Sequence, residues 1–133
     1  MKIFIDTSFL VALNNTKDPL FEKAKSLAKL YYTSKHDFYT SNLILFETAT
    51  ILSMRVNRQV AISAINTINN SDWTFLKLNE DIEQGGWSIF RKTSWKDVGF
   101  VDCTSFYIID KYKIDKAFTF DNDFRKYKIE ILN

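Results

Sequence analysis

Short strand-type apolar runs alternate along the chain with longer runs of helical spacing, and this alternation constrains the fold most. Residues 3–5 (Ile-Phe-Ile) form a buried strand pattern that stops at Asp6, and a helical run follows at residues 9–13. The pattern favours an α/β domain with a mainly parallel sheet that is covered on both faces. The remaining expected strands are 38–40, 73–78, 116–120 and 127–132, and the remaining expected helices are 20–31, 43–54, 60–68, 80–91 and 101–112.

Three local signals predict where helices begin or are disturbed. Asp18 precedes Pro19, a pair typical of a helix start, and Ser41-Asn42 and Asn79 precede the expected helices at 43 and 80. Gly85 and Gly86 lie inside the expected helix 80–91, where each glycine costs about 1 kcal/mol relative to alanine. We therefore expect that helix to be kinked or broken.

The length of 133 residues and the apolar fraction of 46% indicate one domain over residues 1–133 with a substantial core. The apolar run at the N-terminus has three residues, too few for the core of a signal peptide. Nothing in the sequence approaches the roughly 20 apolar residues that span a bilayer. We expect a cytoplasmic protein that does not enter a membrane.

The cysteine and histidine content restricts a metal site to oxygen ligands. A single cysteine, Cys103, excludes an internal disulfide and a zinc site built from cysteines, and a single histidine, His36, excludes a site with several histidines. The 18 basic and 16 acidic residues give a net charge of +2, which neither indicates nor excludes a nucleic-acid partner.

Two aspartates follow strand-type runs directly. Asp6 comes after residues 3–5, and Asp121 comes after residues 117–120. In open parallel sheets, ligands bind at the carboxyl ends of the strands, near the point where the strand order reverses. Each aspartate could instead cap the helix that follows it, because aspartate is a favoured N-cap residue.

Two further acids lie on apolar helix faces. Glu47 shares its face with Leu43 and Ile51, and Asp102 shares its face with Phe106 and Ile109. A carboxylate is costly to bury unless it is paired or bound to a metal. The alternatives are a partly exposed face for Glu47 and an interaction of Asp102 with the helix dipole.

Carboxylates that gather in one site repel each other and raise each other's pKa values, and a divalent cation removes this repulsion. Ligation by oxygen alone suits Mg²⁺ or Mn²⁺. Cations held in this way polarise phosphoryl oxygens and activate water. Metal-assisted hydrolysis of a phosphodiester is therefore the chemistry that these acids predict.

The order and spacing of four short motifs resemble those of the PIN-domain ribonucleases, above all the VapC-type toxins of toxin–antitoxin pairs. The resemblance covers nearly the whole chain. The motifs are Ile3-Phe4-Ile5-Asp6-Thr7-Ser8, Ser41-Asn42-Leu43-Ile44-Leu45-Phe46-Glu47, Phe100-Val101-Asp102-Cys103 and Thr119-Phe120-Asp121-Asn122-Asp123-Phe124.

This resemblance implies a three-layer α/β/α sandwich that acts as an Mg²⁺- or Mn²⁺-dependent endoribonuclease. It also implies an RNA substrate, a cognate antitoxin that blocks the site, and a homodimer. Haloacid-dehalogenase-type phosphatases also begin with an aspartate after the first strand, but Ser8 stands where they have a second aspartate. The resemblance assigns Asp6, Glu47, Asp102 and Asp121 to the catalytic metal site, with Ser8, Thr119 and Asp123 as supporting residues.

A PIN-like domain without turnover, serving as an RNA-binding or assembly module, is the alternative. The presence of all four acids favours the enzyme. Trp87, Trp95 and Phe100 could stack on unpaired bases, although core or dimer packing is the commoner use of such residues. Cys103 is expected to be a small core residue. Three basic clusters could bind the RNA backbone, namely Arg55 with Arg58, Arg91 with Lys92 and Lys96, and Arg125 with Lys126 and Lys128.

Overall fold

A five-stranded sheet forms the centre of the structure, a computed structural model that describes residues 1–32 and 35–133. The strand order is β3-β2-β1-β4-β5, and every pairing is parallel. In the register, Ile3 lies opposite both Phe38 of β2 and Lys116 of β4. The expected α/β class is confirmed. The strands are β1 (Lys2–Ile5), β2 (Asp37–Ser41), β3 (Thr74–Leu76), β4 (Lys116–Phe118) and β5 (Ile131–Leu132).

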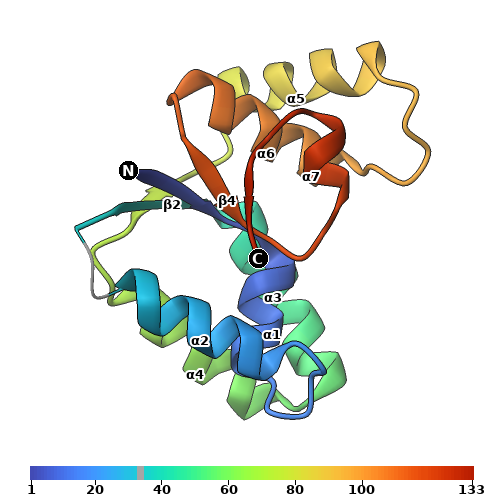
Figure 1. The fold of residues 1–133 in the computed structure, drawn as a ribbon. Coiled ribbons are helices and arrows are strands. Elements are labelled where there is room, and N and C mark those ends of the chain that lie inside the picture. The colour runs from blue at the N-terminus through green and yellow to red at the C-terminus, as the bar shows by residue number, and fades with distance from the viewer. Residues whose placement is uncertain (33–34) are drawn as a thin grey trace.

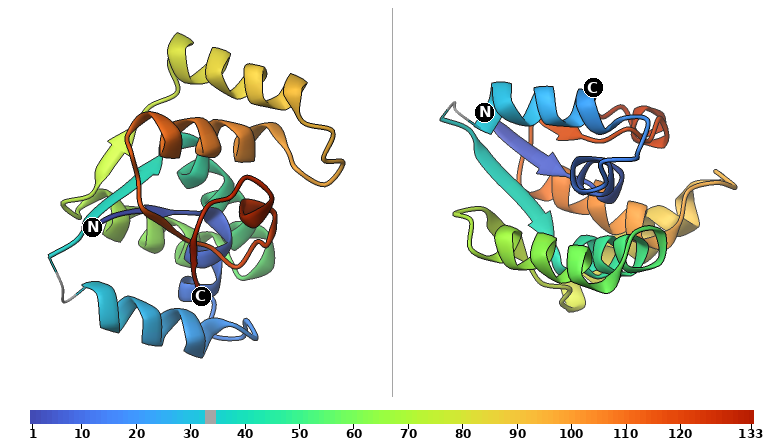
Figure 2. Two further views of the ribbon diagram at one scale, coloured as in Figure 1. Left: turned by 45° about the horizontal axis from the view of Figure 1, so that its top comes forward. Right: turned by 90° about the horizontal axis from the view of Figure 1, so that it is seen from below.

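Helices cover both faces of the sheet, which completes the expected three layers. The pair α5 and α6 lies on one side, and α1 to α4 lie on the other (Figure 1, Figure 2). None of the helices in the described residues is long and apolar enough to cross a membrane. The helices are α1 (Thr7–Asn14), α2 (Phe21–Tyr32), α3 (Asn42–Arg55), α4 (Arg58–Asn69), α5 (Glu80–Lys92), α6 (Phe100–Lys111) and α7 (Asp123–Lys126).

Strand β1 is apolar throughout its central part because it is covered on both faces. Ile3, Phe4 and Ile5 are fully buried, as expected for the middle strand of a parallel sheet. Phe9 of α1 stacks on Phe118 of β4 with ring centroids 4.4 Å apart. Burial of each such side chain contributes about 1.5–3 kcal/mol, so the segments on either side of Asp6 are held firmly in place.

Two of the expected helix caps are confirmed by their hydrogen bonds. The Ser41 hydroxyl accepts from the Ile44 amide at 3.2 Å, and the Asn79 side chain accepts from the Ile82 amide at 2.9 Å. Asp18 behaves differently, because its carboxylate accepts from the Leu20 amide in a turn and α2 begins only at Phe21. The segment 15–20 is thus a turn of the chain rather than the first turn of α2.

The expected break at the two glycines of α5 is wrong. Helix α5 runs without interruption through both, and α6 packs against them so closely that a side chain has no room there. A Cβ atom on Gly85 would lie 2.2 Å from the Tyr107 ring, and one on Gly86 would lie 2.7 Å from the Thr104 methyl group. The glycines therefore permit close helix packing.

The expected boundaries around β1, β4 and β5 need correction. Helix α1 begins at Thr7, directly after Asp6, rather than at residue 9. Strand β4 ends at Phe118, and Asp121 lies in the connection that follows rather than directly after the strand. Most of the expected strand 127–132 is not a strand, since only β5 pairs with β4, and the short α7 precedes it.

Candidate active site

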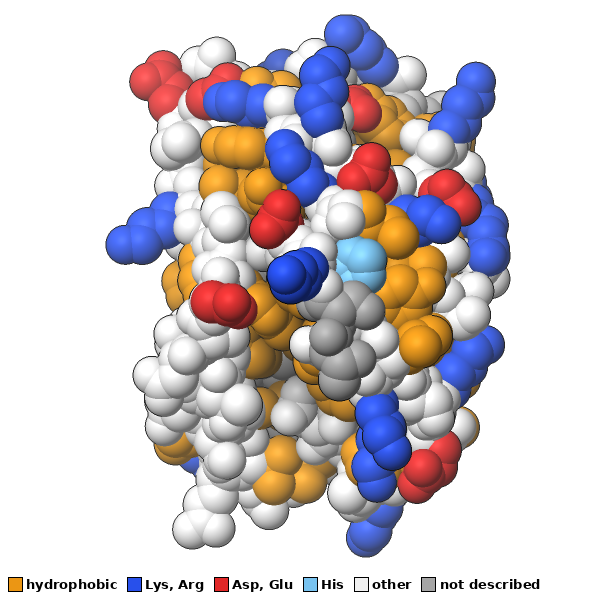
Figure 3. Space-filling model, turned by 60° about the vertical axis from the view of Figure 1, so that its left-hand side comes forward, with side chains coloured by type: hydrophobic (Ala, Val, Ile, Leu, Met, Phe, Trp, Pro, Cys, Tyr) orange, Lys and Arg blue, Asp and Glu red, His pale blue; other side chains and the backbone are white. Residues whose placement is uncertain are grey.

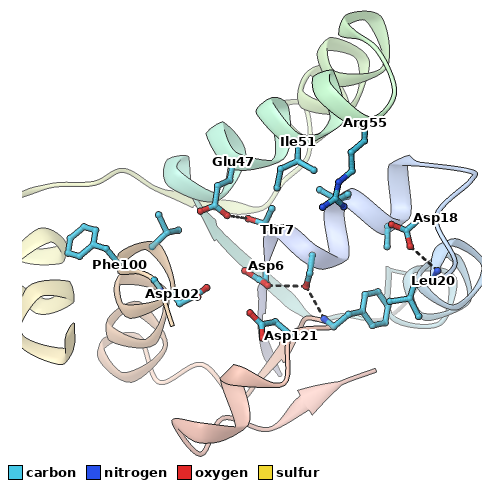
Figure 4. A pocket seen from close by; sticks show the side chains of 16 residues that line it. Asp6, Thr7, Asp18, Leu20, Glu47, Ile51, Arg55, Phe100, Asp102 and Asp121 are labelled. Atoms are coloured by element: carbon cyan, nitrogen blue, oxygen red, sulfur yellow. Dashed lines mark hydrogen bonds between the residues drawn. The ribbon is translucent and has the colours of Figure 1, made fainter. Parts of the chain in front are cut away.

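A cleft of about 610 Å³ opens at the carboxyl edge of the sheet, where the strand order reverses between β1 and β4. Such a reversal is the usual ligand site of an open parallel sheet. All four acids that the sequence singles out face this cleft, and each comes from a different part of the chain (Figure 4). The lining residues are Asp6, Thr7, Ser8, Val11, Ala12, Asp18, Leu20, Glu47, Ile51, Arg55, Gly99, Phe100, Val101, Asp102, Phe120 and Asp121.

Asp6 occupies the N-cap position of α1 but makes no capping hydrogen bond with its side chain. Its Oδ2 atom instead accepts from the Ser8 hydroxyl at 3.0 Å and from the Thr119 hydroxyl at 2.8 Å. The residue is only 4% exposed. The capping alternative is therefore wrong for Asp6, and its carboxylate is oriented by hydroxyl groups from β1–α1 and from the end of β4.

The two hydroxyl groups that hold Asp6 are themselves held by backbone amides. The Phe120 amide donates to Ser8 Oγ at 2.9 Å, and the Asp121 amide donates to Thr119 Oγ1 at 3.0 Å. The two hydroxyl oxygens also lie 3.0 Å apart, so Ser8 and Thr119 form one hydrogen-bonded network around the Asp6 carboxylate. This chain of bonds joins the ends of β1 and β4 across more than 110 residues of sequence.

Glu47 lies on the wall of the cleft, half-buried, on the α3 face that also carries Ile51. The Thr7 hydroxyl donates to Glu47 Oε1 at 2.9 Å and so connects α1 to α3. Thr7 lies in the first of the four motifs, but the motif alone did not predict a role for its side chain. The partly exposed face considered for Glu47 is confirmed, and the space that it faces is the cleft.

Asp102 and Asp121 are each held by a nearby amide. Asp102 lies in the first turn of α6, and its Oδ2 accepts from the Gly99 amide at 3.3 Å, so it also interacts with the helix N-terminus. Asp121 Oδ1 accepts from the Asp123 amide at 2.9 Å. As for Asp6 and Glu47, these bonds fall on one carboxylate oxygen of each residue.

Burial and mutual repulsion disfavour the charged forms of these acids. Burial raises the pKa of Asp6 to about 6, although the hydrogen bonds from Thr119, Thr7 and Ser8 lower it. Burial raises the pKa of Asp102 to about 7, and the charges of Asp6, Asp121 and Glu47 add to the effect. The pKa of Asp121 is also raised, mainly by burial. Several carboxylates thus share one electrostatic environment.

The donor set suits a hard divalent cation that keeps part of its water. Within residues 1–32 and 35–133, no three His, Cys, Asp or Glu side chains are close enough together to hold one ion directly. The four carboxylates nevertheless face one cleft, and within the part of the chain that the structure describes none of their hydrogen bonds comes from a cation. Mg²⁺ typically binds one or two carboxylates and retains several waters, which fits acids that converge without closing on one point.

Asp123 differs from the other residues of its motif. It does not line the cleft, and its Oδ1 accepts from the Lys126 ammonium group at 2.8 Å. Its contacts with the site are the hydrogen bond that its amide donates to Asp121 and the interaction of its side chain with the same carboxyl group, which adds to the effect of burial in raising the pKa of Asp121. Cys103, beside Asp102, is fully buried in the core, as expected, and burial raises the pKa of its thiol.

The two members of the first basic cluster, Arg55 and Arg58, point in different directions. Arg55 lines the cleft, whereas Arg58 turns away and donates to the Ser53 hydroxyl at 3.0 Å. Arg55 is the only cation among the lining residues, and helical spacing from Glu47 was the signal that it shares the cleft wall. On the face that carries His36, the Lys and Arg side chains are dispersed among acidic and apolar ones (Figure 3).

Comparison with known proteins agrees with this geometry. Residues 3–130 match the family model described as PIN domain. The 23S rRNA-specific endonuclease VapC20 of Mycobacterium tuberculosis is 33% identical over 122 residues, which are 92% of this chain and 91% of that protein. The crystal structure of VapC20, described as a sarcin-ricin loop cleaving toxin, has a TM-score of 0.86 and 31% identity, over 96% of this chain and 95% of that one.

Two further solved structures share the fold at lower identity. VapBC2 from Rickettsia felis, bound to a DNA fragment from its promoter, has a TM-score of 0.74 at 13% identity, over 100% of this chain and 98% of that one. FitAcB from Neisseria gonorrhoeae has a TM-score of 0.70 at 16% identity, over 98% of this chain and 96% of that one. At such identities the likeness shows the fold alone.

Proposed function

The chain belongs to the PIN-domain family, and on that premise we propose that it is an endoribonuclease of the VapC toxin type, a single PIN domain over residues 1–133. The observation that carries this proposal is the convergence of Asp6, Glu47, Asp102 and Asp121 on one cleft at the carboxyl edge of the sheet. The likeness to VapC20, which is a 23S rRNA-specific endonuclease, supports RNA as the substrate.

The four carboxylates would hold Mg²⁺ or Mn²⁺ and leave positions for water and a phosphate oxygen. When bound, the ion would polarise the phosphoryl group and supply an activated water. Asp6 is kept in place by Ser8 and Thr119, and Glu47 by Thr7, so these acids are oriented before substrate arrives. Such preorganisation lowers the cost of binding the reacting groups in the correct geometry.

Arg55 is the residue that would hold an RNA phosphate within the cleft. Its guanidinium group extends from α3 toward the end of the cleft marked by Asp18 (Figure 4). A guanidinium group forms paired hydrogen bonds with phosphate oxygens. We expect Arg55→Gln to weaken RNA binding and reduce its dependence on salt, whereas Arg58→Gln, which changes a residue outside the cleft, serves as the matched control.

The end groups of the products test the proposed reaction. In the proposed reaction water attacks phosphorus and the bond to the 3′ oxygen breaks, which leaves 5′-phosphate and 3′-hydroxyl ends. No 2′,3′-cyclic phosphate forms, because the RNA 2′-hydroxyl takes no part. Cleavage should stop in EDTA and return when Mg²⁺ or Mn²⁺ is added. Ends that carry 2′,3′-cyclic phosphate, or cleavage that continues in EDTA, would exclude this mechanism.

We expect single-stranded or looped RNA to be cleaved, since unstacked bases can be turned outward and contacted, which an A-form duplex does not allow. The sarcin-ricin loop of 23S rRNA, which VapC20 cleaves, is the first structured substrate to test. A catalytically silent RNA-binding module would bind this RNA without cleaving it. Calorimetry with Mn²⁺ would separate the two outcomes, because only the nuclease needs the ion.

A nuclease that attacks cellular RNA must be inhibited in the cell that makes it, so we propose a cognate antitoxin as a partner. On the resemblance to the VapC-type toxins we also propose a homodimer as the assembled form. Expression of the chain alone should arrest growth of a bacterial host, and expression of the Asp102→Ala variant should be tolerated. Harmless expression of soluble, folded wild-type protein would count against the toxin assignment.

A further inference from the structure

Three aromatic side chains and one guanidinium group form a cluster beside the acidic cleft. The rings of Trp87 and Phe90, both on α5, lie 5.7 Å apart, and the Phe100 ring lies 4.3 Å from Trp87 and 6.4 Å from Phe90. The Arg91 guanidinium lies 5.9 Å from the centre of the Trp87 ring. We refer to Trp87, Phe90, Phe100 and Arg91 as the aromatic cluster.

The aromatic cluster is exposed, although its members are large and apolar. Trp87 is 37% exposed and Phe90 is 42% exposed. Most other aromatic pairs in the described residues include at least one buried ring, as in Phe106 with Phe124 at 5.1 Å, whereas no ring of the aromatic cluster is buried. Single exposed apolar residues are ordinary, but adjacent exposed rings with a cation over one face indicate a surface that binds something.

Phe100 connects the aromatic cluster to the cleft. It packs against Trp87 and also lines the cleft, two residues before Asp102 in α6. In Figure 4, Phe100 lies at one end of the row of labelled side chains and Asp18 at the other, with the carboxylates between them. A strand of RNA that crosses the carboxylates can therefore reach the rings.

Electrostatics explains why such a strand needs the rings. The cleft is lined by five carboxyl groups and one guanidinium group, so its own charge repels a polyanion. Affinity must therefore come in part from contacts that do not depend on charge. Stacking of a base on an aromatic ring stabilises the complex and tolerates any base, since each base has a π-face.

We propose that the aromatic cluster is a base-stacking subsite, in which Trp87 stacks on an unpaired nucleobase of RNA that flanks the cleavage position. Arg91 extends the stacking surface and contacts the adjoining phosphate. The inference rests on the proposed RNA substrate. It assigns to Trp87 a binding role that does not include chemistry.

The test measures binding, so it does not depend on turnover. A short single-stranded oligoribonucleotide is titrated in EDTA while its anisotropy and the protein's tryptophan fluorescence are recorded. We expect quenching in the wild type, loss of most of the quenching in Trp87→Phe with Kd changed by less than about threefold, and roughly tenfold or weaker binding in Trp87→Leu. The weakening in Trp87→Leu should be the same at low and high salt, because stacking releases no counterions.

Controls separate stacking from folding and from self-association. Phe46→Ala removes a ring that is 62% exposed but lies outside the aromatic cluster, and it should bind as the wild type does. Arg91→Gln serves as a second variant if Trp87→Leu lowers the melting temperature, and it should weaken binding severalfold. Unchanged affinity in folded Trp87→Leu and Arg91→Gln would overturn the proposal.

A second copy of the chain is the competing occupant of this surface. If Trp87→Leu converts a dimer to a monomer in sedimentation velocity while each protomer binds the oligonucleotide as before, the rings form a contact between copies and the proposal is wrong. The proposed function can fail separately. Binding and quenching without cleavage once Mg²⁺ is added would refute the nuclease, and oligonucleotide affinity that Trp87→Leu leaves intact would refute the stacking subsite even if cleavage occurs.

Discussion

Helices α5 and α6 carry two aspartates whose surroundings are opposite. Asp81 forms an ion pair with Lys111 and accepts a hydrogen bond from the Tyr107 hydroxyl at 2.6 Å, and these contacts lower its pKa. Asp102 accepts one long bond from Gly99 and faces other carboxylates, and its pKa is raised to about 7. The chain thus supplies a cation and a hydroxyl donor for Asp81 but, among the described residues, leaves the charge of Asp102 without such partners.

The difference indicates where a ligand supplies the missing charge. Around Asp81 the chain itself provides the donors, so nothing further is needed. Around Asp102 the nearest charges belong to Asp6, Asp121 and Glu47, and repulsion among them is relieved by protonation or by a cation. Perturbed pKa values of this kind gather at functional sites.

The largest expected effect separates the two aspartates by activity. Asp102→Asn should reduce RNA cleavage at least about 100-fold, the upper range for loss of even an outer contact of a metal site. Asp81→Asn should leave cleavage within about twofold of the wild type. Initial rates with Mg²⁺ in excess would measure both. Equal losses in the two variants would mean that the contrast has no functional meaning.

The next effect concerns the close packing that positions Tyr107 beside Asp81. Gly85→Ala would place a Cβ atom 2.2 Å from the Tyr107 ring, and the rearrangement should cost roughly 1–3 kcal/mol of unfolding free energy. Chemical denaturation would measure it, with Ser88→Ala on the same helix as the control. A stability as high as that of the wild type would show that α5 and α6 separate easily.

The pH dependence of stability should distinguish the two regions as well. The folded-state pKa values of Asp6 (about 6) and Asp102 (about 7) lie above 3.8, the ordinary pKa of an aspartate side chain. The folded protein then binds more protons than the unfolded chain, so without metal its stability should fall as pH rises from about 4 to 7 and level off above.

The measurement is a series of thermal melts in EDTA across this range. Asp6→Asn should remove on the order of 2 kcal/mol of this pH-dependent loss of stability. The melting temperature of the metal-free variant at pH 7 should be unchanged or higher. The contribution of Asp81 to stability depends on pH in the opposite direction. Its lowered pKa adds stability that is lost only as pH falls below about 4. A marked drop in the melting temperature of Asp6→Asn at pH 7 would indicate a structural role instead.

The smallest effect is expected from the ion pair itself. Lys111 and Asp81 are both exposed, and an exposed pair contributes little to stability because solvent screens the two charges. Lys111→Met should therefore leave the urea midpoint of unfolding nearly unchanged and leave cleavage unchanged. A larger loss in urea unfolding would mean that the Tyr107 hydrogen bond and the ion pair act together.

The features that the sequence determined by itself are those with local causes. The apolar run of β1 requires burial on both faces wherever it lies, and Ser41 and Asn79 cap the helices that start immediately after them. The place of Asp6 at a strand end and of Asp102 in a first helical turn follows from the same local patterns. Local periodicity and capping are short-range interactions, so the residues themselves display them.

Tertiary structure alone decided which side chains meet. The Thr119 hydroxyl that orients Asp6 comes from 113 residues away, and the reason for a glycine at position 85 is the Tyr107 ring, which leaves no room for a side chain there. The end of β4 at Phe118 likewise depends on the pairing of β4 with β1, where Phe118 lies opposite Ile5. Sequence patterns identify the four acids, but their common electrostatic environment arises from long-range packing. Packing brings together charges that lie far apart in the sequence and that no local pattern connects.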